Sequence, residues 1–329
     1  MIKQPFSSIC MLIAAIFIVA GCAQQRKKNA DVLDRGPDFE KLVVPGDYAD
    51  AAIKATGGLQ HWAKIQKVQL DCVVTFYQPD GSFYLTEHRF YIYPWSNSIE
   101  VTGREPLGAI AWQLSDEQFR LLPADERAGV SAMGVPCRDY AEAILKITTA
   151  PVQFLQAGAT FVRGPAPVKM DGLWYDPIEG LALPLGAGAT PGASAGGKRR
   201  DREGAVVKPY WSKVVYYQNR DSSLVDLLWL ADVDRGKFLA VRGYDYKPVP
   251  SQAEGDVQKN GVLLPTKIEI FRTDARAVSR ERLVKIDLKS LTCFLALPLH
   301  PAAVRQSICR RGSRPGPAGH TTSVPRARR

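Results

Sequence analysis

Cys22 is the residue of this chain whose type and position best fit covalent chemistry. It follows the small residues VAG, which leave the extended backbone accessible to a peptidase, and its thiol is a nucleophile that can be alkylated. The preceding run, Ile9–Ala20, is apolar over twelve residues, and Lys3 is the only charged side chain before Cys22. Such a run is too short for a membrane-spanning helix, which needs about 20 residues, but it fits the apolar region of a secretory signal. The sequence therefore predicts a signal peptide over residues 1–21 and a modifiable thiol directly after it.

The stretch VAGC resembles the lipobox of bacterial lipoproteins. The resemblance implies that the thiol of Cys22 receives a diacylglycerol, that the chain is cut before this residue, and that the new amino group receives a fatty acyl group such as palmitate. Each buried methylene contributes about 0.8 kcal/mol, so several acyl chains together hold a protein firmly on a membrane. In such lipoproteins an aspartate directly after the modified cysteine favours retention in the inner membrane. This chain has Ala23 at that position, and the absence of aspartate favours the outer membrane. The alternative is an ordinary signal peptide with a chance cysteine near its cleavage site.

Two other short motifs that could carry chemistry are incomplete. GASAGGKR, from Gly192, has the glycine and lysine spacing of a phosphate-binding loop, but Arg199 replaces the hydroxyl residue that would bind magnesium and Pro191 interrupts any preceding strand. DVDRG, residues 232–236, has two acids but lacks the other ligands of a calcium loop, so we expect a hairpin turn there. Neither motif supports a nucleotide or metal site.

The histidines and cysteines give no sign of a catalytic or metal site. His61 and His88 have no Cys or acid at metal-ligand spacing, and the other two His follow residue 291. We therefore expect no enzyme activity, no metal and no cofactor. Cys72 and Cys137 either pair in an oxidising periplasm or stay apart, with Cys72 as a buried thiol.

The basic character of the chain lies mostly at its C-terminal end. Of the formal net charge of +10, residues 292–329 carry +7, all from Arg, and Lys3 carries +1, which leaves +2 for residues 22–291. A protein that binds nucleic acid usually concentrates its charge on a folded surface, so we expect no nucleic-acid partner. The tail has no Lys, Asp or Glu. It is either a disordered basic extension or the product of a reading frame that shifted near Leu291, and in both cases we expect no packed structure in it.

The chain after the signal peptide divides by composition into three parts. Residues 22–45 are a polar tether with Gly–Pro and Pro–Gly breaks, and residues 46–291 have the apolar periodicity of a folded domain. Within the domain, residues 186–207 are rich in small and charged side chains, so we expect a flexible loop there. Residues 292–329 form the tail.

The periodicity of the domain predicts mostly antiparallel strands. Helices are expected over residues 47–56 and 139–147, the second ending before Pro151. Elsewhere apolar and polar residues alternate with the period of a strand, most clearly in a hairpin of residues 67–77 and 82–94 around the turn QPDG. Further strands are expected over residues 98–102, 108–114, 118–122, 210–217, 224–231, 237–246, 263–273 and 280–288. A sheet that curls around a helix would hide both its edges and its apolar face.

Four stretches together resemble the lipoprotein localisation factor superfamily, which includes the carrier LolA and the acceptor LolB. The stretches are ATGGLQHWAKI, KVQLDCVVTFYQPDGSFYLTEHRFYI, VRGYDY and GVLLPTKIEIFRTDARAVSRERLVKIDL. The resemblance implies a mainly β (α+β) fold, an incomplete antiparallel β-barrel of about ten or eleven strands with helices plugging its concave face. It also implies an apolar cavity that holds the acyl chains of a lipoprotein.

One face of the first hairpin offers candidates for lining that cavity. An acyl-chain site needs large apolar groups and little buried charge. The candidate residues are Leu70, Val74, Phe76, Phe90 and Ile92. The alternative is that these side chains pack on the helices and leave no space for a ligand.

Two functions therefore stay open. The first is a membrane-anchored lipoprotein of the cell envelope, on the outer membrane and facing the periplasm, that binds lipids or acylated lipoproteins in an apolar cavity. The second is a structural or interaction module of the envelope, with a filled core and no ligand.

Overall fold

The computed structural model describes residues 47–105, 108–115, 118–122, 135–156, 160–181, 210–249, 251–253, 256–258 and 261–295. All of them belong to one compact unit that ends at Leu295. The predicted signal peptide, Cys22, the tether and the loop at 186–207 lie outside the described residues. None of the described helices has both the length and the apolar character needed to cross a membrane.

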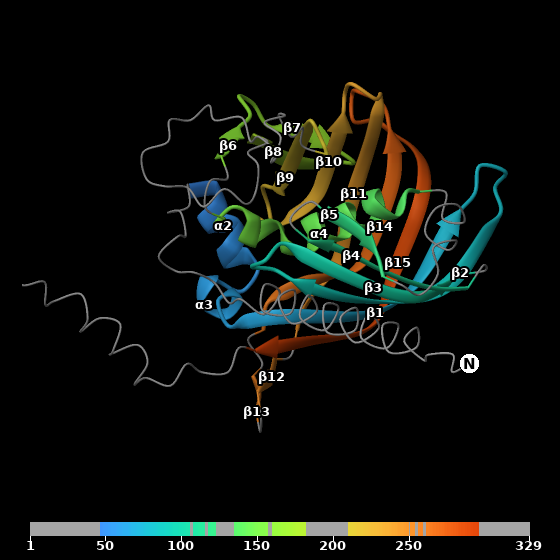
Figure 1. The fold of residues 1–329 in the computed structure, drawn as a ribbon. Helices are drawn as coiled ribbons and strands as arrows, with labels where there is room; N and C mark the ends of the chain where they lie inside the picture. Colours follow the sequence, from blue (N-terminus) through green and yellow to red (C-terminus); the bar gives the residue numbers. More distant parts are fainter. Residues whose placement is uncertain are drawn as a thin grey trace, which may run out of the picture. The chain divides into compact units, whose positions relative to one another are not determined.

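The strands of the described ranges form a single sheet of fifteen strands (Figure 1). Their bounds are β1 (Ile65–Tyr77), β2 (Phe83–Tyr93), β3 (Ser98–Glu105), β4 (Gly108–Ser115), β5 (Gln118–Leu121), β6 (Thr160–Arg163), β7 (Val168–Met170), β8 (Leu173–Leu181), β9 (Lys213–Asn219), β10 (Val225–Asp232), β11 (Lys237–Pro248), β12 (Ser251–Ala253), β13 (Asp256–Gln258), β14 (Leu263–Thr273) and β15 (Ser279–Leu295). The helices are α2 (Asp47–Ala55), α3 (Leu59–Trp62) and α4 (Cys137–Gln153).

Along its main path the sheet has the order β5-β4-β3-β2-β1-β15-β14-β11-β10-β9-β8-β6, and neighbours on this path are antiparallel. The two end strands, β5 and β6, do not pair with each other, so the described sheet is not closed. The predicted incomplete antiparallel barrel is confirmed. The strand number exceeds the predicted one by β6, β7, β8, β12 and β13. Four of these have only three or four residues, too few for an alternating pattern to be recognised, and β8 is the fifth.

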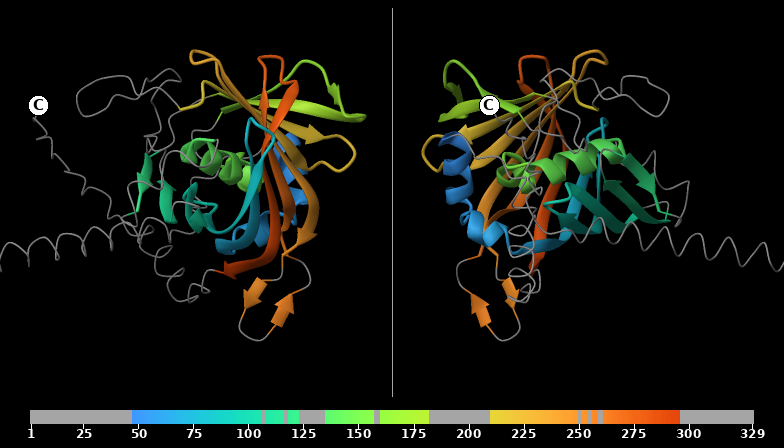
Figure 2. Two further views of the ribbon diagram at one scale, coloured as in Figure 1. Left: turned by 90° about the vertical axis from the view of Figure 1, so that its right-hand side faces the viewer. Right: turned by 60° about the vertical axis from the view of Figure 1, so that its left-hand side comes forward.

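Helix α4 lies inside the curve of the sheet (Figure 2). It contacts β3 and β4 toward one end of the sheet and β10, β11 and β14 toward the other, and it also contacts α2. Almost every α4 side chain is buried as a result. The prediction that this helix ends before Pro151 is wrong. Proline removes one backbone donor, but it stands in the last turn, and the core burial of Pro151, Val152 and Phe154 offsets that loss.

Strand β15 extends beyond the predicted domain boundary. It pairs with β1 as far as Leu295, with Cys293 opposite Val68, so Thr292–Leu295 belong to the sheet. The expectation that packed structure stops at Leu291 is wrong for these four residues, because the ladder continues although the composition changes. Cys293 is buried and is a third cysteine of the domain. Residues 296–329 lie outside the described part of the chain.

Glycines allow two of the turns that shape the sheet. Gly57 and Gly58 have positive φ angles of 109° and 87°, and the amide of Gly58 donates to the carbonyl of Ile53, which ends α2. The stretch from Val168 to Pro177, for which the sequence pattern predicted neither helix nor strand, forms the hairpin of β7 and β8. Its turn is Asp171–Gly172, with φ angles of 50° and 84°, the geometry that favours a two-residue hairpin loop.

Candidate functional site

The five predicted cavity residues lie on one face of β1 and β2. The register of this hairpin places Leu70 opposite Phe90 and brings Ile92 opposite Val68, so alternate side chains of both strands point the same way. All five are buried and belong to one hydrophobic core cluster: Leu70, Val74, Phe76, Phe90 and Ile92. The sequence thus placed them correctly on a common apolar face. Whether this face binds acyl chains stays a prediction.

Tyr140 of α4 covers this face. Its ring centroid lies 5.6 Å from that of Phe76, 5.9 Å from that of Phe90 and 6.0 Å from that of Trp112. Its hydroxyl oxygen lies 3.1 Å from Nδ1 of His88, which is itself buried among these rings. The side chain of Tyr140 has no solvent exposure. Tyr140 therefore occupies the position that a ligand above Phe76 and Phe90 would need.

The described grooves lie beside this face. A groove of about 910 Å³ is lined by residues of β1, β2, β3, β4 and β15, and one of about 320 Å³ is lined by Tyr77, Phe271, Ser279 and Arg282. None of the five predicted cavity residues lines either groove.

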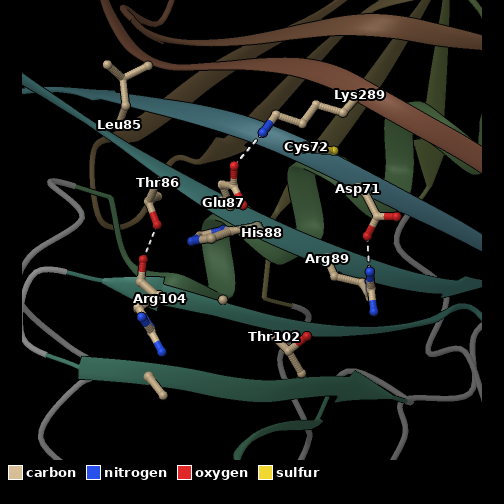
Figure 3. A pocket seen from close by; sticks show the side chains of 12 residues that line it. Asp71, Cys72, Leu85, Thr86, Glu87, His88, Arg89, Thr102, Arg104 and Lys289 are labelled. Atoms are coloured by element: carbon tan, nitrogen blue, oxygen red, sulfur yellow. Dashed lines mark hydrogen bonds and ion pairs between the residues drawn. The ribbon is translucent and has the colours of Figure 1, made fainter.

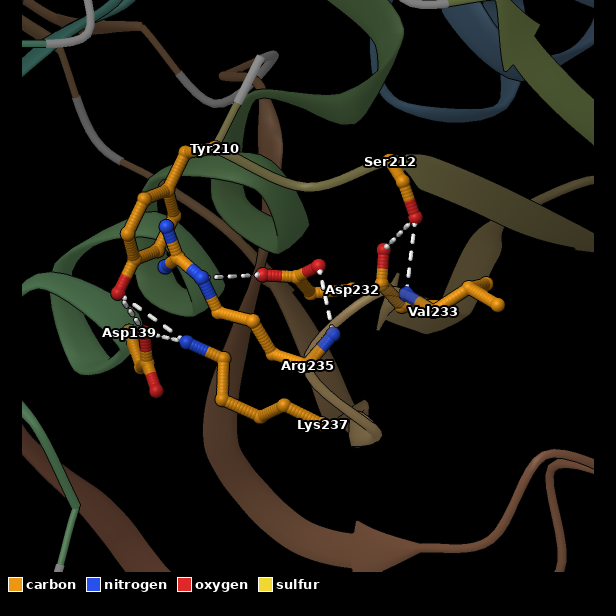
Figure 4. Close-up of polar contacts among 8 residues, drawn as sticks. Asp139, Tyr210, Ser212, Asp232, Val233, Arg235 and Lys237 are labelled. Carbon is orange, nitrogen blue, oxygen red and sulfur yellow. Dashed lines mark hydrogen bonds and ion pairs between the residues drawn. The ribbon is translucent and has the colours of Figure 1, made fainter. Parts of the chain in front are cut away.

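A polar cluster holds the N-terminal end of α4 (Figure 4). The carboxylate of Asp139, with only 1% of its surface exposed, accepts a hydrogen bond from the Tyr210 hydroxyl and another from Nζ of Lys237 at 2.8 Å. Nζ of Lys237 also lies 3.1 Å from the Tyr210 hydroxyl oxygen and 4.4 Å from the Trp211 ring centroid. Lys237 begins β11 directly after the turn that leaves β10. We call Asp139, Tyr210 and Lys237 the α4 latch.

The buried charges at and near the latch have neighbours of opposite charge. Burial, and then the hydrogen bond to Asp139, raises the pKa of the Tyr210 hydroxyl, which keeps it a neutral donor. The guanidinium carbon of Arg138 lies 3.6 Å from the centroid of the Tyr210 ring, a cation–π contact. One turn on, the buried Glu142 lies 3.5 Å from Nζ of Lys146. Because each buried carboxylate has a cation beside it, the helix can carry these charges inside the curved sheet.

Sequence reasoning missed the latch. Asp139 was visible as an acid in the first turn of the predicted helix, but an acid at that position is equally typical of an exposed helix end. Its partner Lys237 lies 98 positions further along the chain. Only the placement of the β10–β11 turn beside the helix brings the two together.

The cysteines and histidines behave as structural residues. Cys72 is a free thiol whose pKa is raised by burial, and Cys137 is buried, so the disulfide that was one of two open alternatives is not formed. His88 is buried against Tyr140. Within the described ranges, no group of three or more His, Cys, Asp or Glu is arranged to hold a metal ion.

No family model matches the chain, and no curated protein matches it. Among solved structures, the chain is similar to a LolA superfamily protein from Nitrosomonas europaea, with a TM-score of 0.42 and 13% identity over 78% of this chain and 96% of that one. It is also similar to a DUF1329 family protein from Desulfovibrio piger, with a TM-score of 0.39 and 10% identity over 79% of this chain and 97% of that one. A domain from Vibrio parahaemolyticus, named for outer membrane lipoprotein sorting, has a TM-score of 0.36 and 9% identity over 80% of this chain and 100% of that one.

Proposed function

We propose that this chain is a lipid-anchored protein of the cell envelope that binds acyl chains of lipids or lipoproteins between its curved sheet and α4. The observation that carries the proposal is a continuous apolar sheet face that is covered by the single helix α4. The α4 latch fixes the N-terminal end of this helix to the start of β11. The thiol of Cys22 and its VAGC context support the anchor, and Ala23 supports the outer membrane. The protein acts by binding and not by catalysis.

Binding in this scheme exchanges protein side chains for lipid. A palmitoyl chain has about 15 carbons beyond its carbonyl, and at about 0.8 kcal/mol for each buried methylene it contributes about 12 kcal/mol when it leaves water completely. Displacing a buried aromatic side chain such as Tyr140 costs about 3–5 kcal/mol. The acyl chain can therefore offset the loss of the Tyr140 contacts and a part of the α4 latch.

A second candidate function is an envelope interaction module with a filled core. The observation in its favour is the complete burial of the five predicted cavity residues beneath Tyr140. In that case α4 is a permanent part of the core, and partners bind the outer surface of the sheet.

Brominated acyl chains, which quench tryptophan fluorescence at short range, distinguish the two functions. Trp112 is buried beside Tyr140, whereas Trp174 of β8 is 48% exposed. The full chain and its variants Trp112→Phe and Trp174→Phe are titrated with a brominated palmitoyl phospholipid in detergent micelles, against the unbrominated lipid.

For acyl-chain binding we expect quenching that is reduced by Trp112→Phe and not by Trp174→Phe. The indole N–H of Trp112 has no hydrogen-bond partner among the described residues, so phenylalanine at this position removes no bond to any of them. Quenching that Trp112→Phe leaves unchanged, together with no lipid in the purified protein by mass spectrometry, would overturn the proposal and support the interaction module.

A further inference from the structure

The groove of about 910 Å³ lies where β2 and β3 separate (Figure 3). β2 pairs with β3 from Tyr93 only as far as His88, opposite Gly103, whereas it pairs with β1 from Ile92 to Phe83. The segment Leu85–Glu87 therefore lies beyond the last pair with β3 and is paired only with β1, on one side. No other described strand pairs with its second side. A strand edge of this kind presents unpaired backbone groups to any extended segment that approaches it.

Glycine at position 103 lets β3 approach β2 closely at His88, the last pair before the two strands separate. A Cβ atom on Gly103 would lie 2.4 Å from Cδ2 of His88 and 3.0 Å from the carbonyl oxygen of Glu87, so any side chain there would displace the His88 ring. Beyond this point the hydroxyl of Thr86 donates to the carbonyl of Arg104, which takes the place of a ladder hydrogen bond. The opening is thus fixed by specific contacts on both strands.

The floor of the groove touches the predicted acyl-chain face. Cys72 and His88 face each other across β1 and β2, both line the groove, and both are almost completely buried. The ring centroid of His88 lies 5.9 Å from that of Phe76 and 6.0 Å from that of Phe90. The groove therefore leads from the outer surface of the sheet down to the ring cluster beneath Tyr140.

The walls of the groove are polar and slightly basic. Arg89 pairs with Asp71, and Lys289 of β15 pairs with Glu87, as Figure 3 shows. Arg104 is exposed and adds one further positive charge to the lining. Leu85 contributes an apolar surface that is 62% exposed. The groove thus offers an extended peptide backbone pairing, one apolar contact and a small excess of positive charge.

We propose that this groove binds an extended peptide as an added strand on the open edge of β2, and that the peptide is the segment that follows the acylated cysteine of a lipoprotein. The inference rests on the proposed function, because it requires the acyl chains to lie beneath α4. A lipoprotein joins its acyl chains and its polar linker at one residue, so a protein that holds both needs an interior apolar site and a peptide site that meet. In this protein the apolar site and the peptide groove meet at His88.

Main-chain hydrogen bonds contribute affinity in this mode of binding, in addition to the acyl chains. The excess positive charge favours a linker with acidic residues.

Site-specific photo-crosslinking tests the inference on the full chain. The photoreactive amino acid p-benzoylphenylalanine replaces Leu85 in one variant and Val162 in a control; Val162 is 51% exposed on β6, at the far end of the sheet. The probe is a dipalmitoyl-cysteine peptide with an acidic tail of about six residues, the usual length of a strand. It is compared with the same peptide without acyl chains and with one whose alternate tail amides are methylated.

We expect crosslinking at position 85 and not at 162, and only with the acylated probe. Methylation of the tail amides should reduce it at least about tenfold, because each lost hydrogen bond weakens binding. Arg104→Glu should reduce it by up to about fivefold, and a basic tail should restore it.

Four results would overturn the inference. If the acylated probe binds but crosslinks equally at both positions, the groove is not a peptide site, and the proposed function is unaffected. If the crosslinking yield is the same with the methylated tail, the peptide does not bind as an added strand. A crosslinked product of two copies of this chain, formed without peptide, assigns the edge to self-association. Failure of the acylated probe to bind at all would reject the proposed function together with the inference.

Discussion

Replacing Tyr140 by alanine tests whether α4 is a removable cover or a fixed part of the core. The side chain is fully buried, and a buried aromatic side chain removes about 150–250 Å² from water. At about 25 cal/mol per Å² this corresponds to about 4–6 kcal/mol as an upper bound. Aromatic-to-alanine replacements in cores cost about 3–5 kcal/mol, so we expect Tyr140→Ala to lower the free energy of unfolding by that amount.

Tyr140→Phe is the matched control for this change. It keeps the ring between Phe76 and Phe90 and removes only the hydroxyl that lies 3.1 Å from Nδ1 of His88. One intramolecular hydrogen bond is worth about 0.5–1.5 kcal/mol, so the phenylalanine variant should lose no more than this. The difference between the two variants therefore isolates the contribution of the ring.

Urea unfolding, followed by circular dichroism with and without a fluorescent palmitoyl probe, measures both effects. The alanine variant leaves a space lined by Phe76, Phe90 and Trp112, which a bound acyl chain can fill. The probe should therefore stabilise Tyr140→Ala more than the parent protein, with an affinity at least about tenfold higher.

Two results would refute this reasoning. A loss of less than about 1 kcal/mol for Tyr140→Ala would show that the ring is not packed as described. A large loss of stability with no gain in probe affinity would show that acyl chains do not occupy this space, which favours the filled-core module.

Four further changes test other parts of the structure. Lys237→Met should cost about 3–5 kcal/mol in urea unfolding because it leaves the buried Asp139 carboxylate without its cation, and adding Asp139→Asn should recover part of this loss. Burial raises the pKa of Asp226, so Asp226→Asn should stabilise the protein at neutral pH. This gain should fade as the pH falls toward about 4, where the parent carboxyl is also protonated and the charge no longer disfavours folding. Gly103→Ala should cost about 1–3 kcal/mol by thermal unfolding, since its Cβ meets the His88 ring, and an unchanged stability would contradict the described approach of these residues. Cys22→Ser should abolish incorporation of labelled palmitate and release the protein from the membrane fraction; retention there would exclude the lipid anchor.

The sequence predicted best those elements whose pattern is long and local. β1 and β2 follow from strict alternation, and their shared apolar face could be identified because a strand places every second side chain on one side. The β7–β8 hairpin stayed ambiguous because its first strand has only three residues. The C-terminal end of α4 was misplaced because the local effect of Pro151 was weighed without the burial that follows it.

Residues that act together from distant parts of the chain could not be predicted. Lys237 meets Asp139, and β15 pairs with β1, only because the order of strands brings them together. Alternation gives the faces of a strand but carries no information about its neighbours, so many strand orders fit the same pattern.

By itself, the sequence determined the apolar run of residues 9–20 with the thiol of Cys22 after it, the mostly antiparallel character of the domain and the residues of its inner face. These follow from chemistry within a few residues of one another. The tertiary structure alone decided that α4 fills the curve of the sheet, that a buried ion pair fixes its end, and that β2 separates from β3 above His88. Each of these depends on the free energy of packing between segments that lie far apart along the chain, so no local sequence pattern indicates it.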